Sequence, residues 1–485
     1  MGQEIQLKKF IRSDFNEFEN RLHQETEQLN ECHEQVNRES TERDFKFGLE
    51  LEAWIIDNQG NPNAINHKLF SETSNTLIVP ELSKYNIEFN TTPLDIQGSC
   101  FSKTHLQLQS LIAEADRILE KWNSKVCLIG TLPTLKETDL NLEQISAMQR
   151  YKALNEQIMK MRRGAPLFLN IRGEEHLRTS HYDVMLEAAT TSLQIHLQPP
   201  AHHFLDYFNA TELISPVIVA LSANSPFAFG KNLWAESRIP IFEQAVSVAD
   251  IVFDRNNQQN RVGFAHRYLD HSVMEIFQNN LNYPVLLPIL FQESDNFSHL
   301  KLHNGTIWRW NRPLISDTKK NIRFRIEHRV CSSGPTLTDS IANVVFYIGA
   351  VKAVVDAGLA FSKNLNFKQI RKNFYLAARK GLNCSIAWPV ATGRDSVKIE
   401  KLHISEIVRE ILIPAARESL LKLQVDSSEI DHYLDVIALR IKTHKNGANW
   451  QQEFMKHTQG SFHDMVLQYS EYQRQDKPIA TWNLS

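Results

Sequence analysis

The chain has 485 residues, of which 42% are hydrophobic and 22% charged, a composition that supports a large buried core in one large enzyme domain or two ordinary ones. Its 53 basic and 56 acidic residues leave a net charge of -3, so no overall electrostatic field favours nucleic acid or an anionic membrane as a partner. The five cysteines are widely spaced and form no C-x-x-C pair, which argues against a disulfide framework or structural zinc site and indicates a reducing compartment.

The amino-terminal residues MGQEIQLKKF contain no apolar core of the signal-peptide type, which predicts a cytoplasmic protein. Apolar side chains at spacings of three, four and seven over residues 10 to 36 predict an amphipathic helix. No repeat, low-complexity block or Gly/Ser linker divides the rest of the chain. We therefore expect a helical segment over residues 1–40 and a single domain over residues 41–485, helical in its carboxyl-terminal part.

The first strand is predicted at FGLELEAWI, residues 47 to 55, where alternation places Glu50 and Glu52 on one face. The two carboxylates start roughly 7 Å apart and, at an effective dielectric of ~20, repel by about 2 kcal/mol, so a cationic group should offset them. A solvated strand face with Lys or Arg opposite would also provide that charge. A second strand, YNIEFNTTP at residues 85 to 93, carries Glu88 at the strand end before a proline.

Helices are predicted at about residues 103–122 and 143–162, with the short strand VCLIG between them. Two later strands, TTSLQIHLQ at 190–198 and IRFRIEHRV at 322–330, each combine an apolar face with a polar one. The polar faces comprise Ser192, Gln194, His196 and Gln198 in the first strand and Arg323, Arg325, Glu327 and Arg329 in the second. Either strand alone could belong to an antiparallel sheet that is wetted on one side.

The longest apolar stretch, residues 341 to 361, carries Asn343, Lys352 and Asp356, and the last two are spaced as a helical ion pair. We expect a buried helix of a soluble protein here rather than a membrane span.

Together, the three polar-faced strands predict a cavity lined by oxygen ligands, with arginines near its far edge. Divalent cations such as Mg²⁺ favour carboxylate oxygens and bridge to phosphates, and they would supply the cationic charge beside Glu50 and Glu52. Arginine binds carboxylate or phosphate in bidentate pairs. The chain has no G-x-x-x-x-G-K-[ST], G-x-S-x-G or H-E-x-x-H motif, so ATP would be held through metal bridges and no protein nucleophile is indicated.

The ordered motifs resemble the carboxylate-amine ligases, a family that includes glutamate-cysteine ligases of the plant and proteobacterial type and is related in fold to glutamine synthetase. The similar segments, spread over about residues 45 to 451, are GLELE, EFNTTP, RYKAL, TTSLQIHLQ, LSANSPFAFGK, GTIWRWNRP, RIEHRVCSSGPTLTDS and NGANWQ. LSANSPFAFGK, residues 221 to 231, is the most specific of them. The resemblance implies an α+β fold in which an antiparallel sheet curves into a funnel, with helices outside and Mg²⁺ ions at its floor.

The resemblance also implies two metal sites. One would contain Glu50 and Glu88, and the other Glu52, Glu327 and the position of Gln194 or His196. Related ligases often have His-x-His on that strand, whereas this chain has Gln194 first, as in the plant-type branch. His196 is then a candidate to lie next to the metal ligands or to face a phosphate of ATP. Gln194 and His196 are both candidates for binding the nucleotide, and the resemblance does not decide which of the two is the metal ligand.

The resemblance also implies roles for four arginines. Arg329 and Arg312 would act in catalysis, and Arg238 and Arg150 would bind a substrate carboxylate or phosphate.

The function that the resemblance implies is an ATP- and Mg²⁺-dependent ligase, for which Mn²⁺ could replace Mg²⁺. It would phosphorylate a substrate carboxylate, with the γ-carboxylate of glutamate as first choice, and pass the acyl group to an amine such as cysteine. Its partners would be small molecules, without nucleic acid or membrane, and a homo-oligomer is allowed. Two alternatives stay open: a metal-dependent hydrolase or phosphoryl-transfer enzyme that activates water, and a non-catalytic binding protein on the same fold.

Overall fold

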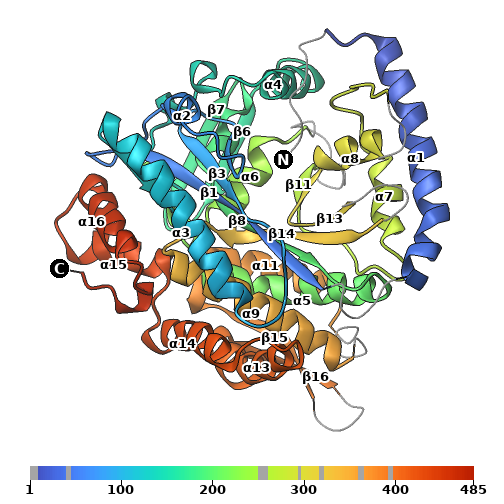
Figure 1. Ribbon diagram of the computed structural model, residues 1–485. Helices are drawn as coiled ribbons and strands as arrows, with labels where there is room; N and C mark the ends of the chain where they lie inside the picture. The colour runs from blue at the N-terminus through green and yellow to red at the C-terminus, as the bar shows by residue number, and fades with distance from the viewer. Residues whose placement is uncertain are drawn as a thin grey trace.

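An antiparallel sheet occupies the centre of the molecule (Figure 1). The structure is a computed structural model, and it describes residues 9–39, 45–248, 260–292, 297–315, 322–358, 365–391 and 397–484. Within these residues the central sheet has eight strands in the order β13-β14-β8-β1-β3-β2, with β4 and β5 also paired to β1. Its strands are β1 (Lys46–Asp57), β2 (Ile78–Pro80), β3 (Asn86–Asn90), β4 (Leu94–Asp95), β5 (Ser124–Cys127), β8 (Ser192–Gln198), β13 (Asn311–Ile315) and β14 (Phe324–Ser332).

Among the described residues, four two-stranded sheets lie outside the central one. They are formed by β6 (Leu167–Arg172) with β7 (His176–His181), β9 (Phe227–Ala228) with β10 (Lys231–Asn232), β11 (Val262–Gly263) with β12 (Trp308–Arg309), and β15 (Ser385–Ala391) with β16 (Val397–His403).

Helices surround the central sheet (Figure 1). They are α1 (Arg12–Glu39), α2 (Asn66–Phe70), α3 (Cys100–Leu119), α4 (Gln149–Met161), α5 (Phe204–Ser222), α6 (Arg238–Ala245), α7 (Met274–Asn280), α8 (Ser298–Gly305), α9 (Leu337–Asp356), α11 (Phe367–Lys380), α12 (Ile404–Glu406), α13 (Ile413–Lys422), α14 (Ser427–Thr443), α15 (Gly447–His457) and α16 (Phe462–Arg474). The predicted α+β class with a large antiparallel sheet is confirmed.

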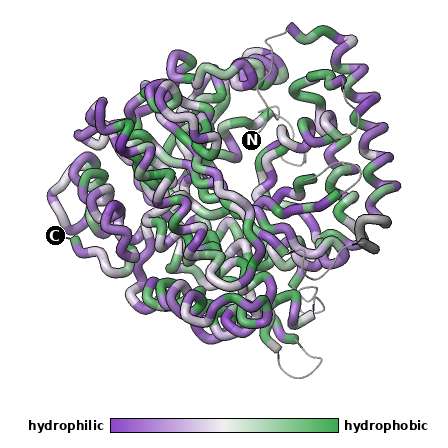
Figure 2. Tube along the Cα trace, in the orientation of Figure 1, coloured by the Kyte–Doolittle hydropathy of each residue, from purple (hydrophilic) through white to green (hydrophobic). Residues whose placement is uncertain are grey.

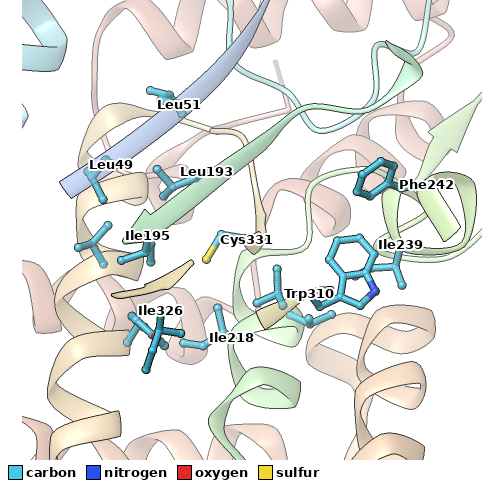
Figure 3. Packing of buried hydrophobic residues seen from close by; sticks show 14 of the residues in the cluster. Leu49, Leu51, Leu193, Ile195, Ile218, Ile239, Phe242, Trp310, Ile326 and Cys331 are labelled. Carbon is cyan, nitrogen blue, oxygen red and sulfur yellow. The ribbon is translucent and has the colours of Figure 1, made fainter. Parts of the chain in front are cut away.

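The core lies between the apolar face of the sheet and helix α5, which packs directly on β14. Figure 3 shows Leu49 of β1, Ile195 of β8 and Ile326 of β14 on that face, with Ile218 of α5 below them. All four side chains are buried to 2% exposure or less. Because side chains alternate along a strand, the polar residues between them project from the opposite face of the sheet.

Each polar-faced strand forms close to its predicted position, since the two-residue alternation is strong in all of them. Glu88 lies in the middle of β3 rather than at a strand end, so that expectation was wrong by two residues. The predicted helix at 143–162 begins later, at Gln149, because Leu142–Gln144 form a separate 3₁₀ turn.

Two helical segments, Ala201–Ser222 and Leu337–Asp356, are long and apolar enough to cross a membrane by length and composition alone. Both are mostly buried inside the protein, and the core helix of a soluble protein passes the same test, so they are weak evidence for a span. The expected ion pair forms in the second, with Lys352 Nζ 2.5 Å from Asp356 Oδ1. Residues 359–361 of the predicted stretch lie outside the described residues.

Helix α1 lies along one edge of the molecule, and Figure 2 shows that it is mostly hydrophilic. Its apolar positions Phe18, Leu22 and Leu29 are buried against the neighbouring helices α7 and α8. Glu25 anchors the contact: its carboxylate accepts hydrogen bonds from His299 Nδ1 at 2.6 Å and from the backbone N–H of Leu300 at 2.9 Å. The division into a helical segment and a single following domain stays a prediction.

Candidate active site

The strand register brings the polar side chains together on the face of the sheet opposite the core. On β1, Glu50 lies across from Gln194 of β8 and Asn90 of β3. Two residues further along β1, Glu52 lies across from Glu88 of β3. With β13 and β14, whose contribution is described below, strands β1, β3 and β8 place polar side chains on one surface.

A second row crosses β13, β14 and β8, where Arg312 lies opposite Glu327 and Glu327 opposite His196. Potential ligand atoms of Glu50, His196 and Glu327 all lie within 4.8 Å of one another, and we call these residues the Glu327 group. Glu327 is 3% exposed and His196 8% exposed. The spacing suits a single cation that contacts the two carboxylates.

Glu52, Glu81 and Glu88 form a second cluster, the Glu88 group, whose ligand oxygens also lie within 4.8 Å of one another. Burial, with the charges of Glu50 and Glu52 nearby, raises the pKa of Glu88 to about 8. Burial and the charges of Glu88 and Glu52 likewise raise the pKa of Glu81 well above its usual value. Glu88 Oε2 and Glu81 Oε1 are buried without a hydrogen-bond partner in the described part of the chain. Crowded carboxylates with free oxygens fit a hard divalent cation, which would remove the repulsion.

This grouping differs from the one implied by the family resemblance, which joined Glu50 with Glu88 and Glu52 with Glu327. The reason is the register: Glu52 faces Glu88 directly across the β1–β3 pair, whereas Glu50 reaches diagonally toward His196 on β8.

Gln194 connects the two groups. Its Nε2 donates to Glu52 Oε1 at 2.8 Å, and its Oε1 accepts from Arg329 Nη2 at 3.2 Å. Glu52 is fixed further by the backbone N–H of Ser192, which donates to Oε2 at 2.6 Å. Both ends of the Gln194 amide are thus engaged with site residues.

The hydrogen-bond network assigns the tautomer of His196. Arg325 Nε donates to His196 Nδ1 at 3.2 Å, so Nδ1 accepts and the ring carries its hydrogen on Nε2. Nε2 lies 3.2 Å from Glu50 Oε1 without the alignment of a hydrogen bond. A protonated Nε2 has no lone pair for a metal ion, so this arrangement favours contact with a phosphate or carboxylate oxygen.

Two arginines converge on Glu327. Arg312 donates from Nε and Nη2 to the two carboxylate oxygens, each at 2.8 Å, and Arg329 donates from Nη2 to Oε2 at 2.9 Å. Burial alone would raise the pKa of Glu327, but the two guanidinium groups hold it well below its usual value. Glu327 is therefore ionised, and Arg329 extends from it toward Gln194 and the Glu88 group.

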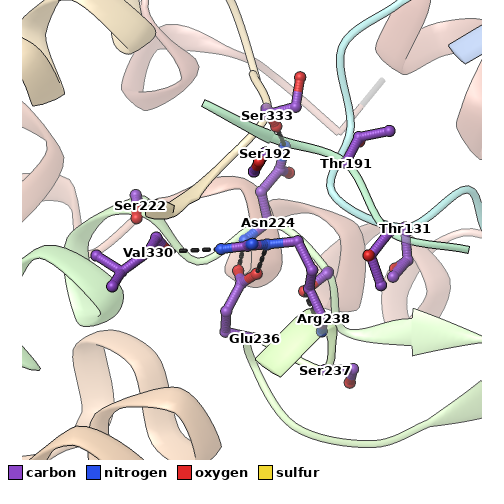
Figure 4. A network of polar contacts seen from close by, with 12 residues as sticks. Thr131, Thr191, Ser192, Ser222, Asn224, Glu236, Ser237, Arg238, Val330 and Ser333 are labelled. Carbon is purple, nitrogen blue, oxygen red and sulfur yellow. Dashed lines mark hydrogen bonds and ion pairs between the residues drawn. The ribbon is translucent and has the colours of Figure 1, made fainter. Parts of the chain in front are cut away.

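Arg150 and Arg238, both expected to bind substrate, have different surroundings. Arg150 lies at the start of α4 and donates from Nη2 to Tyr151 Oη at 2.8 Å. Its positive charge partly opposes the rise that burial causes in the pKa of nearby Glu81. Arg238 is 2% exposed and its guanidinium is bonded to Glu236 and to backbone carbonyls of β14 (Figure 4). These contacts give Arg238 bonds to the protein through Nε, Nη1 and Nη2, and substrate binding by this residue stays a prediction.

Two acidic residues of the site were missed in the sequence. Glu81 directly follows β2, and Glu187 lies on the 3₁₀ turn Val184–Ala189 that precedes β8. Burial and the charge of Glu52 raise the pKa of Glu187 to about 7. The only sequence signal for either was proximity to a polar-faced strand, since neither lies within a strand that alternates.

The fold is similar to that of a known glutamate–cysteine ligase. The glutamate–cysteine ligase of Francisella tularensis, solved in complex with AMP, aligns with a TM-score of 0.56 and 13% identity over 91% of this chain and 90% of that one. A bifunctional glutathione synthetase from Pasteurella multocida aligns with a TM-score of 0.46 and 11% identity over 94% of this chain and 55% of that one. The ligase PafA, solved in complex with the ubiquitin-like protein Pup, aligns with a TM-score of 0.36 and 11% identity over 88% and 72% of the two chains.

The comparison with curated proteins finds no match. The family model described as glutamate-cysteine ligase family 2 matches residues 46–471, a span that contains both acidic groups and all four arginines discussed above. Ligases of this family use ATP and Mg²⁺ to join a carboxylate to an amine. The expectation drawn from the motifs is therefore confirmed: the chain belongs to glutamate-cysteine ligase family 2.

Proposed function

We propose that this protein forms a γ-glutamyl amide bond from glutamate and an amine, with ATP as phosphoryl donor. The observation that carries the proposal is that two acidic clusters, the Glu327 group and the Glu88 group, lie next to each other. Gln194 connects them, and Arg329 contacts Gln194. The donor set is almost entirely carboxylate oxygen, which fits Mg²⁺ or Mn²⁺.

The carboxylates would hold the metal ions. Glu52, Glu81 and Glu88 would bind one, and Glu50 with Glu327 another, while the ions when bound neutralise charge on the ATP phosphates. His196, with its Nε2 hydrogen, would donate to a phosphate or carboxylate oxygen beside the Glu327 group.

Arg329 would contact the phosphoryl group during transfer. Its guanidinium reaches from Glu327 to Gln194 and so lies between the two acidic groups. Arg312 occupies both oxygens of Glu327 and keeps that side chain fixed, which is the preorganisation that phosphoryl transfer requires. The site thus activates a carboxylate by positioning and electrostatics, consistent with the absence of a nucleophile motif.

The proposed route passes through an acyl phosphate. Attack of the glutamate γ-carboxylate on the γ-phosphorus of ATP releases ADP, and attack of the amine on the acyl carbon then releases phosphate. One oxygen of the carboxylate leaves with that phosphate.

Isotope transfer tests the proposal. Glutamate labelled with ¹⁸O in its side-chain carboxylate, Mg-ATP and a panel of amines including cysteine should yield ADP, labelled phosphate and an amide of the expected mass. AMP formation would indicate an adenylate route instead. Unlabelled phosphate without amide would support the hydrolase, and absence of turnover across the panel would contradict glutamate as the acyl donor or an enzymatic role.

A further inference from the structure

Strand β14 contains a bulge at Arg329. His328 lies opposite Ile195 of β8, but Cys331 lies opposite Leu193, so the register shifts by one residue between them. Arg329 and Val330 together therefore occupy the place across from Gln194 that one residue would fill in a regular strand. Bulges next to active sites commonly redirect a side chain, and this one includes the arginine that reaches both acidic groups.

Arg238 binds the two carbonyls of the bulge. Its Nη1 donates to Arg329 O at 3.2 Å and its Nη2 donates to Val330 O at 2.6 Å. Successive carbonyls of a regular strand point toward opposite neighbours, so a single guanidinium can reach both only where the backbone is turned. A buried carbonyl without a donor costs free energy, so the two hydrogen bonds from Arg238 stabilise the backbone conformation at Arg329 and Val330.

Glu236 holds Arg238 in turn. Its Oε1 accepts from Arg238 Nε at 2.9 Å and its Oε2 accepts from the backbone N–H of Asn224 at 2.9 Å, with the Glu236 side chain fully buried (Figure 4). Asn224 Nδ2 donates to Ser333 O at 2.7 Å, just beyond β14. The segment LSANSPF, the most specific motif of the chain, is thereby tied to the end of β14.

Trp310 contacts both Arg238 and the backbone of Arg329. The Arg238 guanidinium lies 5.3 Å from the centroid of the Trp310 ring, and Trp310 O accepts from the backbone N–H of Arg329 at 3.0 Å. Both backbone polar groups of Arg329 are thus held by residues outside the pairing with β8.

We propose that Arg238, fixed by Glu236, is a positioning residue that maintains the β14 bulge and thereby directs the Arg329 guanidinium between Glu327 and Gln194. The proposal rests on the proposed function for the catalytic role of Arg329. It assigns no substrate contact to Arg238.

The test compares Arg238→Lys with Arg440→Lys. Arg440 is a matched control because it is 1% exposed and donates to Asp339 Oδ1 at 2.8 Å and to Leu221 O at 3.2 Å. Its hydrogen-bond partners among the described residues are Leu221, Asp339 and Asn343, which lie outside β14. Both substitutions remove a buried fork that lysine cannot replace, so both should lower the melting temperature. Only Arg238→Lys should lower kcat, because it displaces the Arg329 guanidinium. A displacement of about 1 Å should reduce kcat on the order of 100-fold, with little change in KM for ATP.

A double-mutant cycle with Arg329→Lys separates positioning from a general loss of stability. If Arg238 acts through Arg329, the substitution Arg238→Lys should have little further effect on kcat once Arg329 is lysine. The proposal would be overturned if the kcat loss in the double variant equalled the product of the losses in Arg238→Lys and Arg329→Lys. Equal kcat losses in Arg238→Lys and Arg440→Lys would also overturn it.

A crystal structure of the Arg238→Lys protein provides a readout that does not depend on activity. We expect an altered bulge and loss of the Arg329 contacts to Glu327 or Gln194; unchanged contacts would overturn the proposal. If Arg329→Lys retains wild-type turnover, the proposed function of Arg329 fails, while the crystal structure still decides whether Arg238 positions it. Should Arg238→Lys fail to fold, Glu236→Gln, which weakens the hold on Arg238, is used in the same measurements with the same expected directions.

Discussion

Glu88 combines full burial with a carboxylate oxygen that no donor in the described residues contacts. We predict that Glu88→Gln raises the free energy of unfolding of the metal-free protein at pH 8 by about 1–3 kcal/mol, because it removes a buried carboxyl that is partly ionised at this pH and whose pKa is raised. The same substitution should weaken Mg²⁺ binding, measured by calorimetry. Glu243→Gln is the control: burial raises the pKa of Glu243 to about 7, but this residue belongs to neither acidic group, so Mg²⁺ affinity should not change. Equal effects of both substitutions on Mg²⁺ binding would contradict the assignment.

His196 provides a second prediction at the residue scale. Because its Nδ1 accepts from Arg325, we expect His196→Asn to change nucleotide-free Mg²⁺ affinity by less than tenfold, about 1.4 kcal/mol, while Glu50→Gln weakens it more than tenfold. The KM for Mg-ATP should rise in His196→Asn if the ring donates to a phosphate. An Mg²⁺ affinity that falls as far in His196→Asn as in Glu50→Gln would show that the ring is a ligand.

The identities of most site residues could be predicted from alternation, since Glu50, Glu52, Gln194, His196 and Glu327 all project from the face expected of them. Their grouping could not, because it depends on the register between strands that are far apart in the sequence. The contacts of Arg238 with the backbone could not be predicted either, because an arginine that donates to backbone carbonyls has the same sequence signal as one that binds a substrate.

At the scale of elements, α1 offers a prediction about its attachment. Glu25 is buried and accepts from His299 and from the amino terminus of α8, so Glu25→Ala should leave buried donors unpaired and lower the free energy of unfolding by about 1–3 kcal/mol. Urea unfolding measures the loss, and limited proteolysis within α1 should become faster. Glu27→Ala, on the exposed side of the same helix, should change stability by less than about 0.5 kcal/mol. Identical proteolysis of both variants would show that the Glu25 contact does not hold the helix.

Elements with a strong period were predictable within a few residues, as β1, β8, β14 and α3 show. The bulge in β14 could not be predicted, because the alternation of residue types in RIEHRVCSS gives no sign of the extra residue between His328 and Cys331. Helix α4 begins later than predicted because residues Leu142–Gln144 form a separate 3₁₀ turn. No glycine or proline marks this boundary in the sequence.

At the scale of the whole molecule, the predicted class rested on the order of several weak motifs rather than on any one of them. Segments separated by nearly three hundred residues along the chain, from β1 to β14, meet on one sheet surface, and this arrangement explains why the order was informative. Composition indicated no preference for nucleic acid or membrane, which stays an expectation. It could not identify the amine, because no alternating strand or charge pattern marks its pocket.

The acidic surface should also control how the stability of the entire protein depends on pH. Burial raises the pKa of Glu52, Glu81 and Glu88 above their ordinary value in the folded state, so the folded protein holds protons that the unfolded chain releases. The stabilisation that comes from these groups is fully present below the ordinary pKa of 4.5 and is lost as pH rises toward about 8, the folded pKa of Glu88. Differential scanning fluorimetry of metal-free protein should therefore show a melting temperature that falls across this interval, with a smaller fall in Glu88→Gln. Saturating Mg²⁺ should raise the melting temperature most at the alkaline end, where the carboxylates are ionised without proton competition. A Mg²⁺ stabilisation that is independent of pH, or largest near pH 5, would mean that the ion does not bind these carboxylates.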